Sequence, residues 1–252
     1  MIMKILLACT IAAGLLFSQQ AFADDICTDR PGKSSGTCVV PEGHFQLETD
    51  LYNWTNNGPV LFTSPVVKYG LGHNLDIELG ITPYERVGHS YGSGDLYIKL
   101  KYEFLNEKIV KAALFPYIKI PIAPAPQIGN GRVEGGLLVP VQFSLPLDFS
   151  LTFVPEIDQF KNPNGYGYYT NFQGVINLQH TIFTDRVIGA VELWQQIPII
   201  QNSGRRIPQQ QSIDISVQWL VTPSFQVDGG INFGTNSATP RQQIYVGISQ
   251  FF

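Results

Sequence analysis

The sequence predicts a transmembrane, antiparallel, up-and-down β-barrel of about twelve strands, and three observations lead to this fold class. Polar and apolar residues alternate with period two through segments of about ten residues, the length of a tilted membrane strand. Short and long links alternate between these segments. The chain is 44% hydrophobic and only 14% charged, whereas soluble domains are roughly 25% charged.

The first 23 residues have the pattern of a secretory signal peptide, and we assign residues 1–23 to it. Lys4 gives a positive start, residues 5–17 are apolar, and residues 21–23 read Ala-Phe-Ala, a small-x-small cleavage site. This apolar stretch is too short to span a membrane as a helix, and no later stretch is long enough. We therefore expect an exported protein that starts near Asp24.

Residues 24–42 form an N-terminal periplasmic segment ahead of the predicted barrel, which covers residues 43–252. Cys27 and Cys38, the two cysteines that remain after cleavage, lie in this segment. In an oxidising compartment such a pair favours a disulfide. A metal site is the weaker alternative, because two thiols without nearby His or Asp partners fall short of a ligand set. We expect the segment to act as a partial plug at the periplasmic mouth.

Twelve alternating segments follow, eight clear and four weak. The clear segments are 45–52, 75–82, 95–104, 149–158, 171–179, 212–219, 225–233 and 243–252. The weak segments are 61–71, 110–122, 136–147 and 187–196. In the first segment, strict alternation places Tyr52 on the same face as Gln46, Glu48 and Asp50.

Five prolines fall inside these predicted strands: Pro65, Pro116, Pro121, Pro140 and Pro155. Proline cannot donate to the ladder, and a closed barrel has no free edge for it. We therefore expect bulges, kinks or shifted strand boundaries at these positions.

The links decide between a membrane barrel and a soluble sandwich. The short links are 72–74, 105–108, 146–148, 181–185 and 221–224. The long links are 85–94, 123–132, 160–167, 197–209 and 234–241. Short turns at one end and long loops at the other are typical of an outer-membrane barrel, whereas a soluble sandwich has no reason to separate links by length. The even strand number places both termini in the periplasm.

Charge and motifs exclude several function classes. Removal of the signal leaves 15 basic and 20 acidic residues, a net charge of −5, so we expect no nucleic-acid partner. The sequence has no G-x-S-x-G, phosphate loop or metal-spaced cluster. His89 adjoins Ser90 in a long link, but adjacent strand residues point in opposite directions. We expect no enzyme, no cofactor and no metal.

The end of the chain resembles that of bacterial outer-membrane β-barrels. Residues 243–252 alternate along a final strand and stop on the aromatic Phe252. In that class the terminal strand closes the barrel and is read by the barrel assembly machinery. The resemblance implies that Tyr245 and Phe252 belong to this C-terminal signal. It also implies localisation in the bacterial outer membrane, with outer-membrane lipids and lipopolysaccharide as partners.

Both ends of the mature chain resemble one family. The motifs are T-D-R-P at 28–31, V-P-x-G-x-F-Q-x-E-T at 40–49, and T-P-R-Q-Q-I-Y-V-G-I-S-Q-F-F at 239–252. They are similar to the MetA-like outer-membrane transporters of the phenol-degradation meta-pathway, distant relatives of fatty-acid-transporter barrels. The resemblance implies passage of hydrophobic or aromatic compounds. Its opening-motif residues, which would start the barrel and hold the N-terminal loop, are Asp29, Arg30, Pro31, Pro41, Gly43, Phe45, Gln46 and Glu48.

Charged residues on the inward faces are the candidates for lining the lumen. They are Asp76, Glu78, Asp95, Lys99, Lys101, Glu156, Asp158 and Asp228. One interpretation is a hydrated or salt-bridged wall that fills the lumen; the other is a selective path in which Lys99 and Lys101 face carboxylates. About eight strands fill a barrel with side chains and about sixteen leave a channel, so twelve strands predict a narrow or partly occluded lumen.

We expect a porin-like channel or transporter for small compounds, hydrophobic or aromatic ones among them. The main alternative is a structural or surface-interaction barrel whose extracellular loops bind ligands; Arg205 and Arg206 in the longest loop are compatible with it. A lipid-modifying enzyme is a weaker alternative.

Overall fold

The computed structural model describes residues 26–56, 60–125, 128–163, 166–200 and 206–252. Its strands are β1 (Phe45–Thr55), β2 (Val60–Phe62), β3 (Val66–Gly72), β4 (Leu75–Ile81), β5 (Tyr84–Val87), β6 (Ser90–Gly92), β7 (Leu96–Asn106), β8 (Val110–Ile120), β9 (Glu134–Leu138), β10 (Val141–Ser144), β11 (Phe149–Lys161), β12 (Tyr168–Thr181), β13 (Val187–Ile200), β14 (Gln210–Thr222), β15 (Phe225–Gly234) and β16 (Gln242–Phe251). The predicted signal peptide lies outside the described residues. Over the described ranges, no helix has the length and apolar character needed to cross a membrane.

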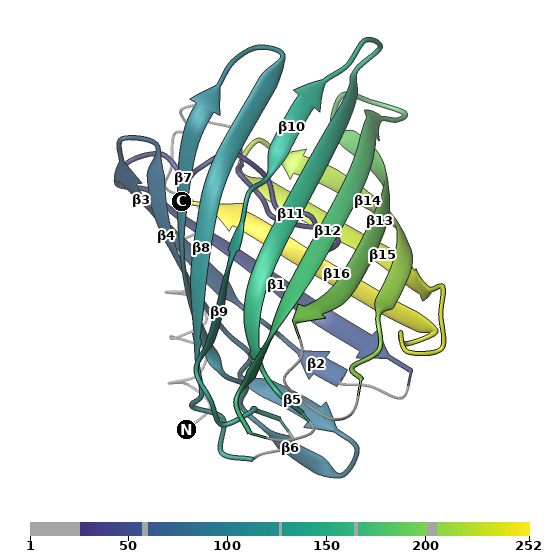
Figure 1. Cartoon of the computed structure of the whole chain (residues 1–252). Helices are drawn as coiled ribbons and strands as arrows, with labels where there is room; N and C mark the ends of the chain where they lie inside the picture. Colours follow the sequence, from purple (N-terminus) through teal and green to yellow (C-terminus); the bar gives the residue numbers. More distant parts are fainter. Residues whose placement is uncertain (1–25, 57–59, 126–127, 164–165, 201–205) are drawn as a thin grey trace, which may run out of the picture.

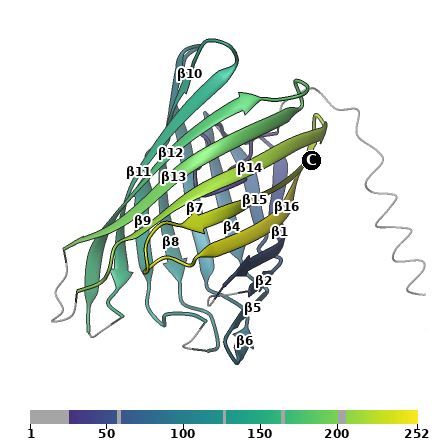
Figure 2. The same cartoon turned by 90° about the vertical axis from the view of Figure 1, so that its right-hand side faces the viewer.

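All strands belong to one antiparallel sheet, which the pairing of β16 with β1 closes into a barrel (Figures 1 and 2). Four positions in the wall are each built from two strands in sequence: β2 with β3, β4 with β5, β6 with β7, and β9 with β10. The sixteen strands therefore make a wall twelve strands around, and the predicted strand number is confirmed.

Proline accounts for three of the four interruptions. Pro65, Pro83 and Pro140 lie between the two halves of their wall strands, because a residue without an N–H cannot complete the ladder. Pro116 and Pro155 stay within β8 and β11, and Pro121 follows the end of β8.

Links at the two ends of the barrel differ in length as predicted. The link from β3 to β4 is a two-residue turn, with His73 and Asn74 both at positive φ (54° and 59°), as a type I′ hairpin requires. The predicted long link 85–94 differs from a plain loop. It contains β5 and β6, which pair as a hairpin and continue past the barrel rim (Figure 1).

Side chains alternate between an apolar outer face and a polar inner face. On β14, Ile215 is 54% exposed whereas the neighbouring Asp214 is 2% exposed. This pattern is the reverse of a soluble domain, because lipid solvates the outside and the polar groups look inward. The prediction for Tyr52 was wrong: a bulge between Asp50 and Tyr52 shifts the register, so Tyr52 lies on the outer face, opposite Val246.

Candidate functional site in the barrel lumen

The chain ahead of β1 lies inside the barrel (Figure 1). The N–H of Val40 donates to Asp76 of β4 at 2.9 Å, and the N–H of Ser34 donates to Glu192 of β13 at 2.8 Å. β4 and β13 are on opposite sides of the closed sheet. This chain, residues 26–44, is called the N-terminal segment below, and it crosses the lumen from one wall to the other.

A disulfide joins Cys27 to Cys38 within the N-terminal segment, with the two Cα atoms 5.8 Å apart. The predicted pairing is confirmed. The side-chain amide of Gln46 on β1 binds the backbone of Cys27 twice, accepting from its N–H at 2.9 Å and donating to its carbonyl at 2.7 Å. The disulfide loop is therefore attached directly to the first strand.

Asp29 is the centre of a buried ionic cluster. Its carboxylate accepts from Lys101 at 2.7 Å and from Lys68 at 2.5 Å. Lys68 also pairs with Glu48 at 2.6 Å, and both lysines lie 3.4 Å from Glu78. Burial acts to raise the pKa of Asp29, but the two ammonium groups outweigh it and hold the pKa well below its usual range. Opposite charges thus hold the N-terminal segment against β1, β3, β4 and β7.

Arg30 makes a second attachment where the barrel closes. Its guanidinium donates to Asp50 of β1 at 2.6 Å and to Asp228 of β15 at 2.9 Å. These carboxylates flank Gly247 of β16, since Gly247 pairs with both residues in the ladder. A Cβ at Gly247 would collide with the guanidinium. Only glycine lets Arg30 lie this close to the wall.

The opposite wall, at β12 and β13, binds the N-terminal segment mainly through the backbone of the segment rather than through ion pairs with its side chains. Glu192 accepts the N–H groups of Lys33 and Ser34, each at 2.8 Å. Asn177 of β12 donates to the hydroxyl of Ser34 at 2.6 Å. The ammonium of Lys33 lies 5.0 Å from the ring centroid of Trp194, within the range of a cation–π contact.

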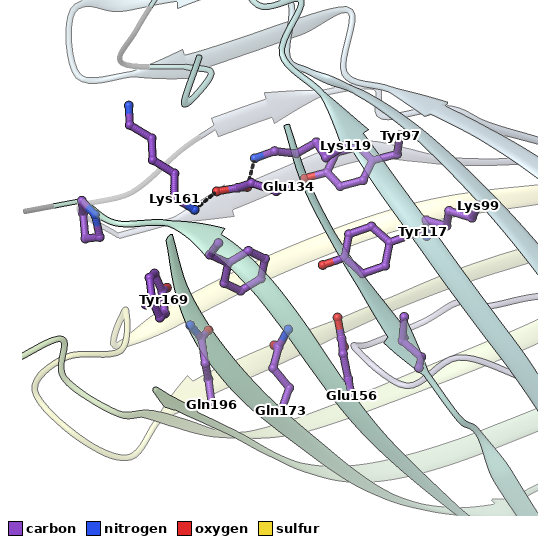
Figure 3. Close-up of a pocket in the computed structure, with 13 residues that line it drawn as sticks. Tyr97, Lys99, Tyr117, Lys119, Glu134, Glu156, Lys161, Tyr169, Gln173 and Gln196 are labelled. Atoms are coloured by element: carbon purple, nitrogen blue, oxygen red, sulfur yellow. Dashed lines mark hydrogen bonds and ion pairs between the residues drawn. The ribbon is translucent and has the colours of Figure 1, made fainter. Parts of the chain in front are cut away.

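A cavity of about 530 Å³ lies at the long-loop end of the lumen (Figure 3). We call it the vestibule. Its lining combines aromatic rings, amides and charges: Tyr97, Lys99, Tyr117, Lys119, Glu134, Leu138, Glu156, Phe160, Lys161, Pro163, Tyr169, Gln173 and Gln196. Glu134 pairs with Lys119 at 2.6 Å and accepts the backbone N–H of Lys161 at 2.7 Å.

Tyr117 covers the position in the inner wall of the vestibule where Gly136 has no side chain. Its partner across the ladder is Gly136, which in turn pairs with Asp158. The ring covers the glycine, where a Cβ would collide with it, and the hydroxyl donates to Asp158 at 2.9 Å. Aromatic cover of a strand glycine of this kind fixes register.

The C-terminal signal residues predicted from the sequence lie on different faces. Tyr245 points inward, covers Gly230 and donates to Asp214 at 2.6 Å. Phe252 follows β16, and its backbone bonds to that of Phe45 at 2.8 and 3.3 Å. Recognition of these residues by the assembly machinery stays a prediction.

The eight predicted lumen residues all lie on the inner face, in two groups. Asp76, Glu78, Lys101 and Asp228 contact or approach the N-terminal segment. The other four lie at or near the vestibule: Lys99 and Glu156 line it, Asp95 is 3.6 Å from Lys119, and Asp158 accepts from Tyr117. Their role in solute passage stays a prediction.

The sequence reasoning missed the vestibule tyrosines and the contacts of Lys33 and Ser34. Period-two alternation could have found Tyr97 and Tyr117, since both occupy inward positions. Lys33 and Ser34 lie in a segment without periodicity. Within the described part of the chain, no group of three or more His, Cys, Asp or Glu side chains is placed to hold a metal ion.

Comparisons with known proteins agree with this architecture. The structure is similar to an outer membrane channel from Pseudomonas putida F1, with a TM-score of 0.67 and 14% identity over 88% of this chain and 99% of that one. It is also similar to the NanC porin, with a TM-score of 0.59 and 8% identity over 82% and 99% of the two chains. At these identities the similarity supports the outer-membrane barrel fold. No curated protein matches the sequence. A family model matches residues 28–252, so the chain belongs to the family described as "Putative MetA-pathway of phenol degradation".

Proposed function

We propose that this barrel is a channel or transporter that passes small compounds, hydrophobic or aromatic ones among them, across the outer membrane. The observation that carries the proposal is the vestibule, a space of about 530 Å³ inside a closed wall. Tyr97, Tyr117 and Tyr169 give it aromatic surface, and Gln173 and Gln196 give it hydrogen-bonding groups. The vestibule lining also includes charged side chains, so a small organic solute would find aromatic surface to contact and polar groups to orient it. The family's description, which names phenol degradation, supports the aromatic class.

The N-terminal segment acts in this proposal as a partial plug. It crosses the lumen and is held by ion pairs at Asp29 and Arg30 and by hydrogen bonds at Glu192. A solute that leaves the vestibule therefore has to pass beside the segment or displace it.

Flux through purified protein in liposomes tests the proposal. We expect uptake of a small uncharged phenol to exceed that of protein-free liposomes. Deletion of residues 24–42 should raise single-channel conductance in planar bilayers. The Cys27→Ser, Cys38→Ser double variant, which keeps the segment, is the matched control. Heat-modifiable gel mobility verifies that each barrel has folded. Absence of both solute flux and conductance in the folded wild type would contradict the proposal.

The proposal includes no catalytic step, so purified protein should leave phospholipid and lipid A unmodified. Its partners are outer-membrane lipids, lipopolysaccharide and, during biogenesis, the assembly machinery. In the alternative role as a surface-interaction barrel, intact cells would bind a loop ligand while liposomes show no uptake.

A further inference from the structure

One row of inward side chains is apolar where its neighbours are polar. On β11, β12 and β13 this row consists of Val154, Val175 and Trp194, which pair directly across the ladder. Pro140 and Ala113 of β8 extend the row on its other side, where the N–H of Ala113 donates to the carbonyl of Pro140 at 3.0 Å. We call these five residues, Ala113, Pro140, Val154, Val175 and Trp194, the apolar row. Val154 is 1% exposed and Val175 is 4% exposed.

Polar rows border it on both sides. Toward the long loops, the next inward-facing position on each of the three strands is occupied by Glu156, Gln173 or Gln196, which pair across the ladder and line the vestibule. Toward the short turns, the next inward-facing positions are occupied by Thr152, Asn177 and Glu192. On β11, β12 and β13 the apolar row is therefore a single band between two hydrogen-bonding zones, whereas toward β8 Leu138 and Phe115 continue it on the long-loop side.

A second cavity, of about 170 Å³, lies on the short-turn side of the apolar row. Uncharged polar side chains dominate its wall, among them Gln142, Thr152, Gln179, Gln218 and Gln226. Its two charged lining residues, Asp29 and Arg30, are both engaged in ion pairs. This inner cavity and the vestibule have no lining residue in common.

The N-terminal segment faces the apolar row from inside the barrel. The ammonium of Lys33 lies over the ring of Trp194, and Glu192 holds the Lys33 backbone next to it. On its vestibule side, Trp194 donates to Gln173 at 3.1 Å, which fixes the ring in the band.

We propose that the apolar row is a hydrophobic barrier between the vestibule and the inner cavity, which excludes hydrated ions and admits uncharged solutes that can shed their water. A hydrated ion beside these five side chains would lose water ligands, and none of the five side chains has a carbonyl or carboxylate group to replace them, whereas an aromatic solute loses little. The inference rests on the proposed function, that the lumen is the route of passage.

Isosteric substitution separates polarity from size. Threonine has nearly the shape of valine but adds a hydroxyl. The full-length Val154→Thr, Val175→Thr variant should therefore raise potassium chloride conductance in planar bilayers by about threefold or more, because a wetted constriction conducts. Ile188→Thr, which changes an apolar residue lining the inner cavity, is the matched control and should leave conductance unchanged. Val175→Thr alone serves if the double variant does not fold.

A Val154→Ala, Val175→Ala variant completes the test, because it widens the row without making it polar. Unchanged conductance in the folded threonine variant would overturn the inference, as would a rise in the alanine variant that the threonine variant lacks. Phenol uptake by wild-type liposomes is measured in parallel. If wild-type liposomes take up phenol but the threonine variant conducts like wild type, the barrier inference is contradicted while the proposed channel function is supported. If folded wild type passes neither phenol nor ions, the proposed function itself is contradicted.

Discussion

The two sides of the inner wall use their charges differently. On the β1–β7 side, Lys68 and Lys101 are fully buried and bound to Asp29 of the N-terminal segment. On the β8–β13 side, Glu192 accepts backbone N–H groups of the N-terminal segment, and other inward side chains of this wall line the vestibule and the inner cavity. Ion pairs on the first side hold the N-terminal segment, and the vestibule lies beside the second. The two interpretations of the mixed lumenal charges thus apply to different places: Lys101 belongs to the salt-bridged wall, and Lys99 lines the vestibule.

Lys101→Met should have the largest effect on stability. It leaves Asp29 and Glu78 with Lys68 as their one remaining lysine in the cluster, and removal of one partner of a buried ion pair typically costs about 3–5 kcal/mol. We expect a lower urea midpoint for unfolding and faster proteolysis at Lys33 as the N-terminal segment is released. Lys99→Met, at the neighbouring inward-facing position of β7, is the control. Equal destabilisation by Lys101→Met and Lys99→Met would refute the contrast between the two sides of the wall.

Arg30→Lys should have the next largest effect and lower the free energy of unfolding by about 2 kcal/mol, because an ammonium cannot bind two carboxylates with the planar geometry of a guanidinium. Asp50 and Asp228 would then compete for one point charge. The same urea titration measures the effect, with Arg132→Lys, at an exposed position, as control. A loss no larger than that of the control would show that the attachment at the closure contributes little.

Tyr117 and Tyr245, the two inward tyrosines that cover glycines, should show a smaller effect. Loss of either hydroxyl should lower the free energy of unfolding by about 1 kcal/mol. Asp158 keeps amide donors from Asn171 and Gln173 when Tyr117→Phe removes its phenol. Asp214 has one carboxylate oxygen that already lacks a hydrogen-bond partner. Tyr245→Phe should therefore destabilise the barrel more than Tyr117→Phe. Thermal gel-shift midpoints compare the two, and the reverse order would contradict this explanation.

Lys99→Gln should change stability least, within about 0.5 kcal/mol. Lys99 makes no ion pair in the described part of the chain, and its ammonium lies 5.3 Å from the ring centroid of Phe115. Loss of this positive charge should shift the reversal potential under a salt gradient toward cation preference. Lys108→Gln, in the exposed turn after β7, should leave the potential unchanged. The same shift in both variants would remove the assignment of Lys99 to the solute path.

The sequence predicted the wall well because period-two alternation is a local property. Ile213 and Ile215 could be placed outside and Asp214 inside from three consecutive positions on one strand. Local pattern could not reveal the bulge beside Tyr52, which depends on the partner strand β16. The hairpin of β5 and β6 was also missed, since its strands are only four and three residues long.

The interior arrangement was harder to predict because it depends on contacts between distant parts of the chain. Lys33 binds Glu192 across 159 residues, and Arg30 binds Asp228 across 198. The family resemblance did point to Asp29, Arg30, Gln46 and Glu48 as a group, and the structure joins Asp29 to Glu48 and Gln46 to the Cys27 backbone. It gave no sign of the apolar row, whose members come from separate strands.

The position of Arg30 above Gly247 has a consequence for biogenesis. Its two carboxylate partners come from the first strand and from the next-to-last, and the glycine beneath it comes from the last. The attachment at Arg30 can therefore be completed only after the last two strands have joined the barrel, whereas the contacts of Asp29 need only β1, β3 and β7. A product truncated before β15 would lack this attachment, so the N-terminal segment would be held less firmly and would be cleaved faster by proteases than in the finished barrel.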